Sequence, residues 1–236
     1  MHRRRTLSLL PGCKDVIHFD KIIMKESNQL NQFNLKELLD AFQRAKQDNE
    51  IIVDEYVSGY VQLTYFFELL GTVFGYVNSD INEKIDILKH YRAGSSSESY
   101  RTVKSMILFE KSKNFVVSPE HPNGCRTLLR LHRALEFASL FMKRLGIASA
   151  HDKSSILAYN SYNETLAKYH PWLIRKGVGI ATYTLGSCGA LLEKCGGAIE
   201  NTDEAKRLLS LVSVAMDNVY EITDHLYTEF DLHKLP

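Results

Sequence analysis

The sequence has few of the features that mark secreted, membrane-spanning or nucleic-acid-coating proteins. Its four cysteines show no CxxC pair and no disulfide-framework spacing, which is typical of reduced thiols in the cytosol. The 29 Lys and Arg residues are balanced by 28 Asp and Glu, so the strong basicity of a nucleic-acid coat is missing. No stretch approaches the roughly 18 apolar residues of a membrane span, and residues 7–10 are too short a run for a signal peptide. We expect a cytosolic protein with no nucleic-acid partner.

Motifs of the common enzyme classes are also missing. The chain contains no GxxxxGK[ST], GxSxG or HExxH pattern, and the glycine-rich residues 186–197 follow no predicted strand and make a poor phosphate loop. His121 and Cys125 are close in sequence, but no second ligand pair accompanies them at zinc spacing. Cysteine and histidine are available to a hydrolase, yet no pattern arranges them. We expect no catalytic activity, no metal and no cofactor.

Helical periodicity dominates the pattern that is present. Residues 1–33 have mixed charge and no sustained period, so we treat them as an N-terminal extension of uncertain order before a domain at 34–236. No run alternates at period two for long enough to predict a convincing strand, and no repeat at a fixed period suggests a solenoid. The sequence predicts an all-α sandwich or bundle of about eight helices, at 34–47, 54–77, 79–91, 97–115, 124–145 (ended by Gly146), 152–169, 171–185 and 202–230.

Three arginines share one stripe of the helix predicted at 124–145. Arg126, Arg130 and Arg133 fall at i, i+4 and i+7, opposite an apolar face. Like charges at i, i+4 repel by about a few tenths of a kcal/mol per pair, so the stripe is a local cost unless an anion or acidic residues neutralise it. A phosphate is well suited to neutralise this stripe, because each guanidinium offers it a planar pair of hydrogen-bond donors. A solvated basic face or internal salt bridges are the alternative.

Two further sites contain polar side chains at informative positions. Asp80 and Lys84 lie four residues apart near the start of the helix predicted from Ser79, where an acid in the first turn suits the helix dipole. The Asp80 carboxylate could accept a hydrogen bond from an amide or hydroxyl while the Lys84 ammonium faces a phosphate. The alternative is an ordinary surface ion pair. His170 precedes Pro171, and a residue before proline disfavours helical backbone dihedral angles. This predicts that His170 lies at a junction between helices.

Aromatic residues indicate an apolar interior, and one of them, the single tryptophan, has two possible roles. Trp172, the only tryptophan, starts a predicted helix beside Arg175 and Lys176, so it is either core or a membrane-interface residue. The remaining aromatics usually indicate core packing, but they could also enclose lipid chains, whose exposure to water costs about 0.8 kcal/mol per methylene. Those that crowd two of the predicted helices are Tyr60, Phe66, Phe67, Phe74, Tyr76, Phe137 and Phe141.

Several motifs occur together in this chain. They are Leu70-Gly-Thr-Val-Phe74 with Asp80 and Lys84 downstream, Ser99-Tyr-Arg101, Gly124-Cys-Arg-Thr, Leu129-Arg-Leu-His-Arg-Ala-Leu135, Ser161-Tyr-Asn163, Tyr169-His-Pro-Trp172, Leu226-Tyr-Thr-Glu229 and Leu235-Pro236. In this combination, the chain from about Asn34 onward resembles the glycolipid transfer protein family. The resemblance implies a two-layer helical fold with one lipid pocket, which carries single sphingolipids between membranes without ATP or metal.

The resemblance also implies a role for each site residue. Asp80 would bind the ceramide amide N–H and His170 the amide carbonyl, while Lys84, Arg126 and Arg130 would hold a phosphate. In the glycolipid-binding branch, the position of Arg126 is a tryptophan that stacks on a sugar, that of Lys84 is an asparagine, and that of Ile87 is a lysine. These three departures imply ceramide 1-phosphate as the ligand.

The expected function is non-vesicular transfer of ceramide 1-phosphate, with transient peripheral contact at membrane surfaces through Trp172. No obligate protein partner is evident. A sensor or scaffold that binds the same lipid without net transfer is the alternative, and a lipid-modifying enzyme comes third because no nucleophile is arranged. Arg133 belongs to a pattern that both branches of the family share, so we expect it to be structural.

Overall fold

The computed structural model describes residues 32–71, 74–116, 123–197, 199 and 201–235. These residues contain nine α-helices, which confirms the predicted all-α class: α2 (Leu35–Ala45), α3 (Val53–Leu69), α4 (Gly75–Ala93), α5 (Val103–Ser112), α6 (Gly124–Ile147), α7 (Ser154–Glu164), α8 (Trp172–Tyr183), α9 (Cys188–Gly196) and α10 (Thr202–Glu229). Two 3-10 helices, η2 (Ser97–Tyr100) and η3 (Ala167–Tyr169), connect them. Most of the expected extension at 1–33 lies outside the described residues, so its boundary with the domain stays a prediction.

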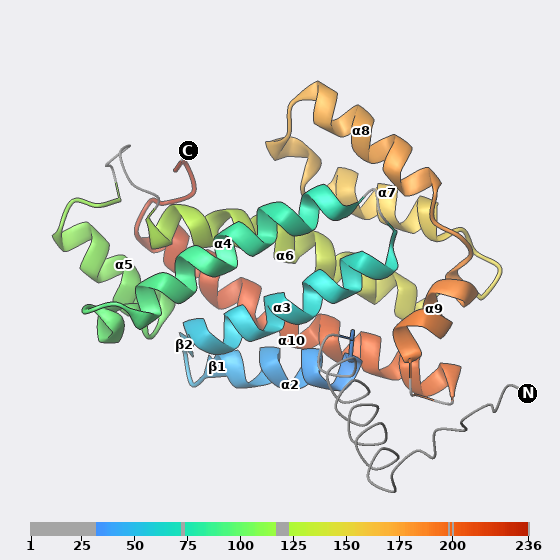
Figure 1. Ribbon diagram of the computed structural model, residues 1–236, viewed down its shortest axis with the longest axis horizontal. Coiled ribbons are helices and arrows are strands. Elements are labelled where there is room, and N and C mark those ends of the chain that lie inside the picture. Colours follow the sequence, from blue (N-terminus) through green and yellow to red (C-terminus); the bar gives the residue numbers. More distant parts are fainter. Residues whose placement is uncertain (1–31, 72–73, 117–122, 198, 200, 236) are drawn as a thin grey trace, which may run out of the picture. The chain divides into compact units, whose positions relative to one another are not determined.

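The helices pack in two layers. Helices α2, α3 and α4 contact one another in sequence order, while α10, α6, α7 and α8 form the second series of neighbours. Contacts of α2 with α10 and of α4 with α6 join the layers, and Figure 1 shows α3 and α4 running across α6 and α10. No helix of the described residues is long and apolar enough to cross a bilayer.

Aromatic side chains fill the space between the layers. Phe66 of α3 contacts Phe141 of α6, with ring centroids 6.0 Å apart, and Phe67 stacks on Phe137 at 6.4 Å. Tyr60 is fully buried and donates a hydrogen bond to the carbonyl oxygen of Leu131 on α6. The core assignment is therefore confirmed for all of the predicted aromatics except Tyr76, whose side chain lies outside the described ones, whereas their role as a sleeve for lipid chains stays a prediction.

One short helix and one pair of short strands were not predicted. Helix α9 lies in the glycine-rich segment, where Cys188, Leu191 and Cys195 are buried at helical spacing and the Ser187 side chain accepts a hydrogen bond from the Ala190 amide. The glycines at both ends of this segment conceal that pattern. In addition, the strands β1 (Lys46–Gln47) and β2 (Glu50–Ile51) form a two-residue antiparallel pair after α2.

Several helix boundaries differ from the prediction: the helix predicted at 54–77 ends at Leu69, and the one predicted at 97–115 is divided into η2 and α5. Helix α4 starts at Gly75 instead of Ser79, so Asp80 lies beyond the first turn and the dipole argument for it was wrong. Helix α6 continues through Gly146 to Ile147. Gly146 instead permits close packing of α6 on α10, because a Cβ there would lie 3.0 Å from the Ser210 hydroxyl and 3.1 Å from the Lys206 carbonyl oxygen.

Candidate functional site

The N-terminus of α6, which presents the arginine stripe, is fixed by a buried carboxylate. Glu110 of α5 is fully buried and accepts hydrogen bonds from the backbone amides of Gly124 (2.6 Å) and Cys125 (3.0 Å). It also accepts one from the Tyr100 hydroxyl at 3.0 Å. A buried charge needs such partners, and a negative charge at a helix N-terminus is favourable. Glu110 therefore sets where α6 begins.

Two more residues make the start of α6 sterically specific. The Asn123 side chain accepts a hydrogen bond from the Arg126 amide at 2.8 Å and caps the helix. A Cβ at position 124 would lie 2.4 Å from the Met106 sulfur, so only glycine fits where Glu110 approaches the backbone. The register of α6, and with it the direction of each arginine, follows from these contacts.

The three arginines of the stripe differ in their surroundings. Arg126 is partly buried, and its positive charge lowers the pKa of Tyr91, against the larger raising effect of burial. Arg130 is exposed and has no hydrogen bond or ion pair among the described residues. Arg133 donates a hydrogen bond to the His233 carbonyl oxygen at 2.7 Å and covers the Tyr169 ring. The structure thus separates Arg133 from the other two.

The Asp80 and Lys84 pair lies on α4, the helix that packs against α6. The Lys84 ammonium is 2.6 Å from the Asp80 carboxylate; the lysine side chain is 5% exposed and the aspartate 65%. A buried ammonium with one carboxylate partner has two remaining donor positions. This pair is therefore not an ordinary surface pair, because its cation is held inside while its anion faces solvent.

His170 lies at the predicted junction, in extended backbone between η3 and α8. Its Nδ1 is 2.8 Å from the Tyr162 hydroxyl of α7. Burial lowers the pKa of His170, and the negative charge of Asp80 opposes that effect, so the two residues interact electrostatically. When Tyr162 donates to Nδ1, the neutral imidazole carries its proton on Nε2, which is then the donor available to a ligand.

Helix α8 exposes its apolar side chains. Trp172 is 62% exposed, so the core alternative for this residue was wrong. Leu173, Ile180 and Tyr183 are 72%, 74% and 86% exposed, and Lys176 lies 5.7 Å from the Trp172 ring centroid. A groove of about 580 Å³ between α7 and α8 is lined by Arg175, Lys176 and Tyr183 among others. Apolar and cationic side chains therefore share one surface.

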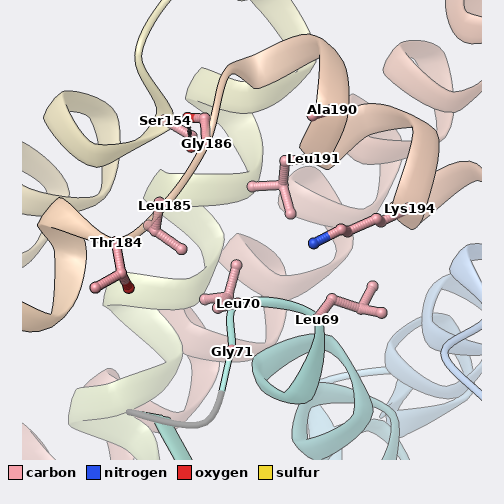
Figure 2. Close-up of a pocket in the computed structure, with 10 residues that line it drawn as sticks. All are labelled: Leu69, Leu70, Gly71, Ser154, Thr184, Leu185, Gly186, Ala190, Leu191 and Lys194. Carbon is pink, nitrogen blue, oxygen red and sulfur yellow. Dashed lines mark hydrogen bonds between the residues drawn. The ribbon is translucent and has the colours of Figure 1, made fainter.

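A separate cavity of about 310 Å³ lies at the end of α3 that is joined to α4. Figure 2 shows leucines around it, including Leu69, Leu70 and Leu191, with the Lys194 ammonium of α9 directed between them. Its lining contains none of the predicted head-group residues. Among the described residues, no group of three or more His, Cys, Asp or Glu side chains is placed to hold a metal ion.

Sequence reasoning missed two residues that organise the site. Glu110 appeared as one charge among many in an amphipathic helix, and only the fold shows that it caps another helix. Tyr162 was noted only within the Ser161-Tyr-Asn163 motif, and its spacing of eight from His170 gave no local signal for their hydrogen bond.

Comparisons with known proteins agree with this architecture. The family model described as Glycolipid transfer protein (GLTP) matches residues 51–197. The ceramide-1-phosphate transfer protein of Xenopus tropicalis is 36% identical over 216 residues, which cover 89% of this chain and 100% of that protein. The apo crystal structure of the mouse ceramide-1-phosphate transfer protein superposes with a TM-score of 0.82 at 36% identity, over 86% of this chain and 100% of that chain.

The human ceramide-1-phosphate transfer protein in complex with 2:0 ceramide-1-phosphate gives a TM-score of 0.79 at 34% identity, over 87% of this chain and 100% of that chain. Together these matches confirm the predicted fold and the expectation of a non-enzymatic protein. The chain belongs to the glycolipid transfer protein family, whose members transfer lipids and catalyse no reaction.

Proposed function

We propose that this lipid transfer protein moves ceramide 1-phosphate between membranes. The observation that carries the proposal is the exposed Arg130 one turn from Arg126 on α6, beside the helix that holds the buried Lys84 ammonium. Three cations on two adjacent helices suit a phosphomonoester, which carries between one and two negative charges near neutral pH. The structures of the human relative with ceramide 1-phosphate bound support the same assignment.

The ceramide part of the lipid would be recognised by Asp80 and His170. The exposed Asp80 carboxylate can accept a hydrogen bond from the ceramide amide N–H while Lys84 turns its free donors to the phosphate. When the Tyr162 hydroxyl donates to Nδ1 of His170, the Nε2–H of the same ring can donate a hydrogen bond to the amide carbonyl oxygen of the lipid. The acyl and sphingoid chains would enter the apolar interior near Phe67 and Phe137.

Uptake and release require contact with a membrane, and we propose α8 for that contact. Its exposed Trp172, Leu173 and Ile180 can enter the apolar layer of a bilayer, while Arg175 and Lys176 remain at the anionic head groups. This contact is peripheral and transient. The family and the free, buried thiols of Cys125, Cys188 and Cys195 support the cytosol as the place of action.

The deciding experiment compares head groups. The full-length protein is expected to move ceramide 1-phosphate between neutral vesicles and to leave galactosylceramide and lactosylceramide in the donor vesicles. A neutral sugar needs stacking and directional hydrogen bonds, whereas Arg126 and Lys84 supply charge. Comparable transfer of the phosphate and sugar lipids would overturn the head-group assignment. Tight binding of ceramide 1-phosphate without transfer would instead identify a sensor or scaffold.

A further inference from the structure

Arg133 connects two segments that are far apart in sequence. Its Nη2 donates a hydrogen bond to the His233 carbonyl oxygen of the C-terminal segment at 2.7 Å. Its guanidinium carbon lies 4.3 Å from the centroid of the Tyr169 ring, within the range of a cation–π contact. The side chain is partly buried between these two partners. One donor group and the planar face of the guanidinium are therefore both used by the protein itself.

Tyr169 is the residue immediately before His170. It ends the 3-10 helix η3, where its amide donates to the Leu166 carbonyl oxygen, and His170 follows in extended backbone. The Tyr162 hydroxyl forms a hydrogen bond with the His170 imidazole. Tyr169 is 41% exposed, and two cations lie over its ring: the Arg133 guanidinium, and the Lys168 ammonium at 5.1 Å from the centroid. A contact that fixes Tyr169 thus restricts the adjacent imidazole.

We propose that Arg133 is a positioning residue for lipid binding: it clamps the C-terminal segment and Tyr169 together and thereby orients His170 toward the lipid amide. The inference rests on the proposed function, since it assigns His170 the amide role. It distinguishes Arg133 from Arg126 and Arg130, which act on the phosphate. A lysine cannot replace it, because an ammonium lacks the planar face that stacks on Tyr169 while a second edge reaches His233.

The test uses full-length Arg133→Met and Arg133→Lys and compares binding of ceramide 1-phosphate with binding of ceramide, which has the amide but no phosphate. If Arg133 acts through His170, Arg133→Met weakens binding of both lipids by the same factor, about tenfold, and Arg133→Lys restores little of it. Arg130→Leu is the matched control and should weaken binding of ceramide 1-phosphate alone. A loss confined to the phosphate lipid, or no loss, would overturn the proposal.

Two further measurements keep the inference testable on its own. In the lipid-free protein, the imidazole NMR signals of His170 should shift in Arg133→Met, and unchanged signals would contradict the clamp even if ceramide 1-phosphate proved not to be the ligand. If Arg133→Met fails to fold, Tyr169→Ala and Tyr169→Phe replace it. The alanine variant should show the same equal loss for both lipids, and the phenylalanine variant, which retains the ring, should bind like the wild type.

Discussion

Helices α6 and α8 are both amphipathic, but they leave opposite faces in water. Helix α6 buries its leucines against α10 and α4 and exposes Arg130. Helix α8 buries Ala181 and Thr182, and its large apolar side chains, among them Leu173 and Ile180, are exposed. Solvent stabilises the first arrangement and penalises the second. The difference indicates that α6 completes a folded core, whereas α8 leaves an apolar face uncovered; the roles proposed above assign the charge on α6 to a ligand and the apolar face of α8 to a membrane.

The largest effect is expected on the charged side of this comparison. Replacing Arg130 by leucine should lower ceramide 1-phosphate transfer about 100-fold, because a charge-assisted hydrogen bond contributes up to about 3 kcal/mol. Circular dichroism and thermal melting should change little, since the side chain is exposed. Lys143→Leu, an exposed cation on the same helix, is the control and should retain transfer. Equal losses of transfer in the two variants would contradict the phosphate-binding role of Arg130.

A smaller effect should follow from polar substitution on α8. Ile180→Ser is expected to weaken binding to vesicles about fivefold, as roughly 1 kcal/mol of apolar burial in the bilayer is lost. Ile147→Ser is a closely matched control, because Ile147 is 78% exposed and Ile180 is 74% exposed. It lies at the end of α6 and should leave vesicle binding unchanged. Sedimentation with vesicles measures both, and equal responses would break the distinction between the helices.

Tryptophan fluorescence reports on the same surface without a mutation. Trp172 is the only tryptophan and is exposed, so its emission should lie at long wavelength in buffer and move to shorter wavelength when vesicles are added. The Ile180→Ser variant should need more lipid for the same shift. A buried-type spectrum in buffer that does not respond to vesicles would contradict the exposure of Trp172 and its membrane role.

The sequence was sufficient for features encoded locally. The spacing of Arg126 and Arg130 predicts their shared face, and Pro171 predicts the extended backbone at His170; the structure contains both. The all-α class also followed from periodicity alone. Burial was less predictable. Nothing near Trp172 in the sequence separates core from surface, because that outcome depends on which helices cover α8.

Contacts between distant segments were not predictable for the same reason. Glu110 and Gly124 are 14 residues apart, and Arg133 and His233 are 100 apart, with no periodic relation between them. Helix α9 was missed because its flanking glycines outweighed the five buried positions in a short segment. Whether the proposed site residues bind lipid as the family resemblance implies stays a prediction.

The last prediction concerns the buried side of α6. His132 stacks on Tyr220 at 4.2 Å, and its Nε2 lies 3.1 Å from Asp224, while its buried Nδ1 has no hydrogen-bond partner among the described residues. Burial lowers the pKa of His132 from 6.5, and the hydrogen bond to Asp224 only partly opposes this. Protonation would place an unsatisfied N–H in the core.

Since the folded chain binds this proton less readily than the unfolded chain, the stabilisation is complete above pH 6.5 and is lost as the pH falls from there toward the lower, folded pKa. The free energy of unfolding, measured with urea, should therefore decrease over that range. His132→Phe keeps an aromatic ring beside Tyr220 but cannot titrate, so its stability should fall less steeply than that of the wild type. Asp224 does not contribute to this decrease, because its pKa is lowered from 3.8 and its contribution to the free energy of unfolding is lost only under more acidic conditions. Burial also lowers the pKa of His170 from 6.5, so a residual slope in His132→Phe is expected. An unchanged slope would mean that the inner face of α6 admits water and is no more sealed than the exposed face of α8.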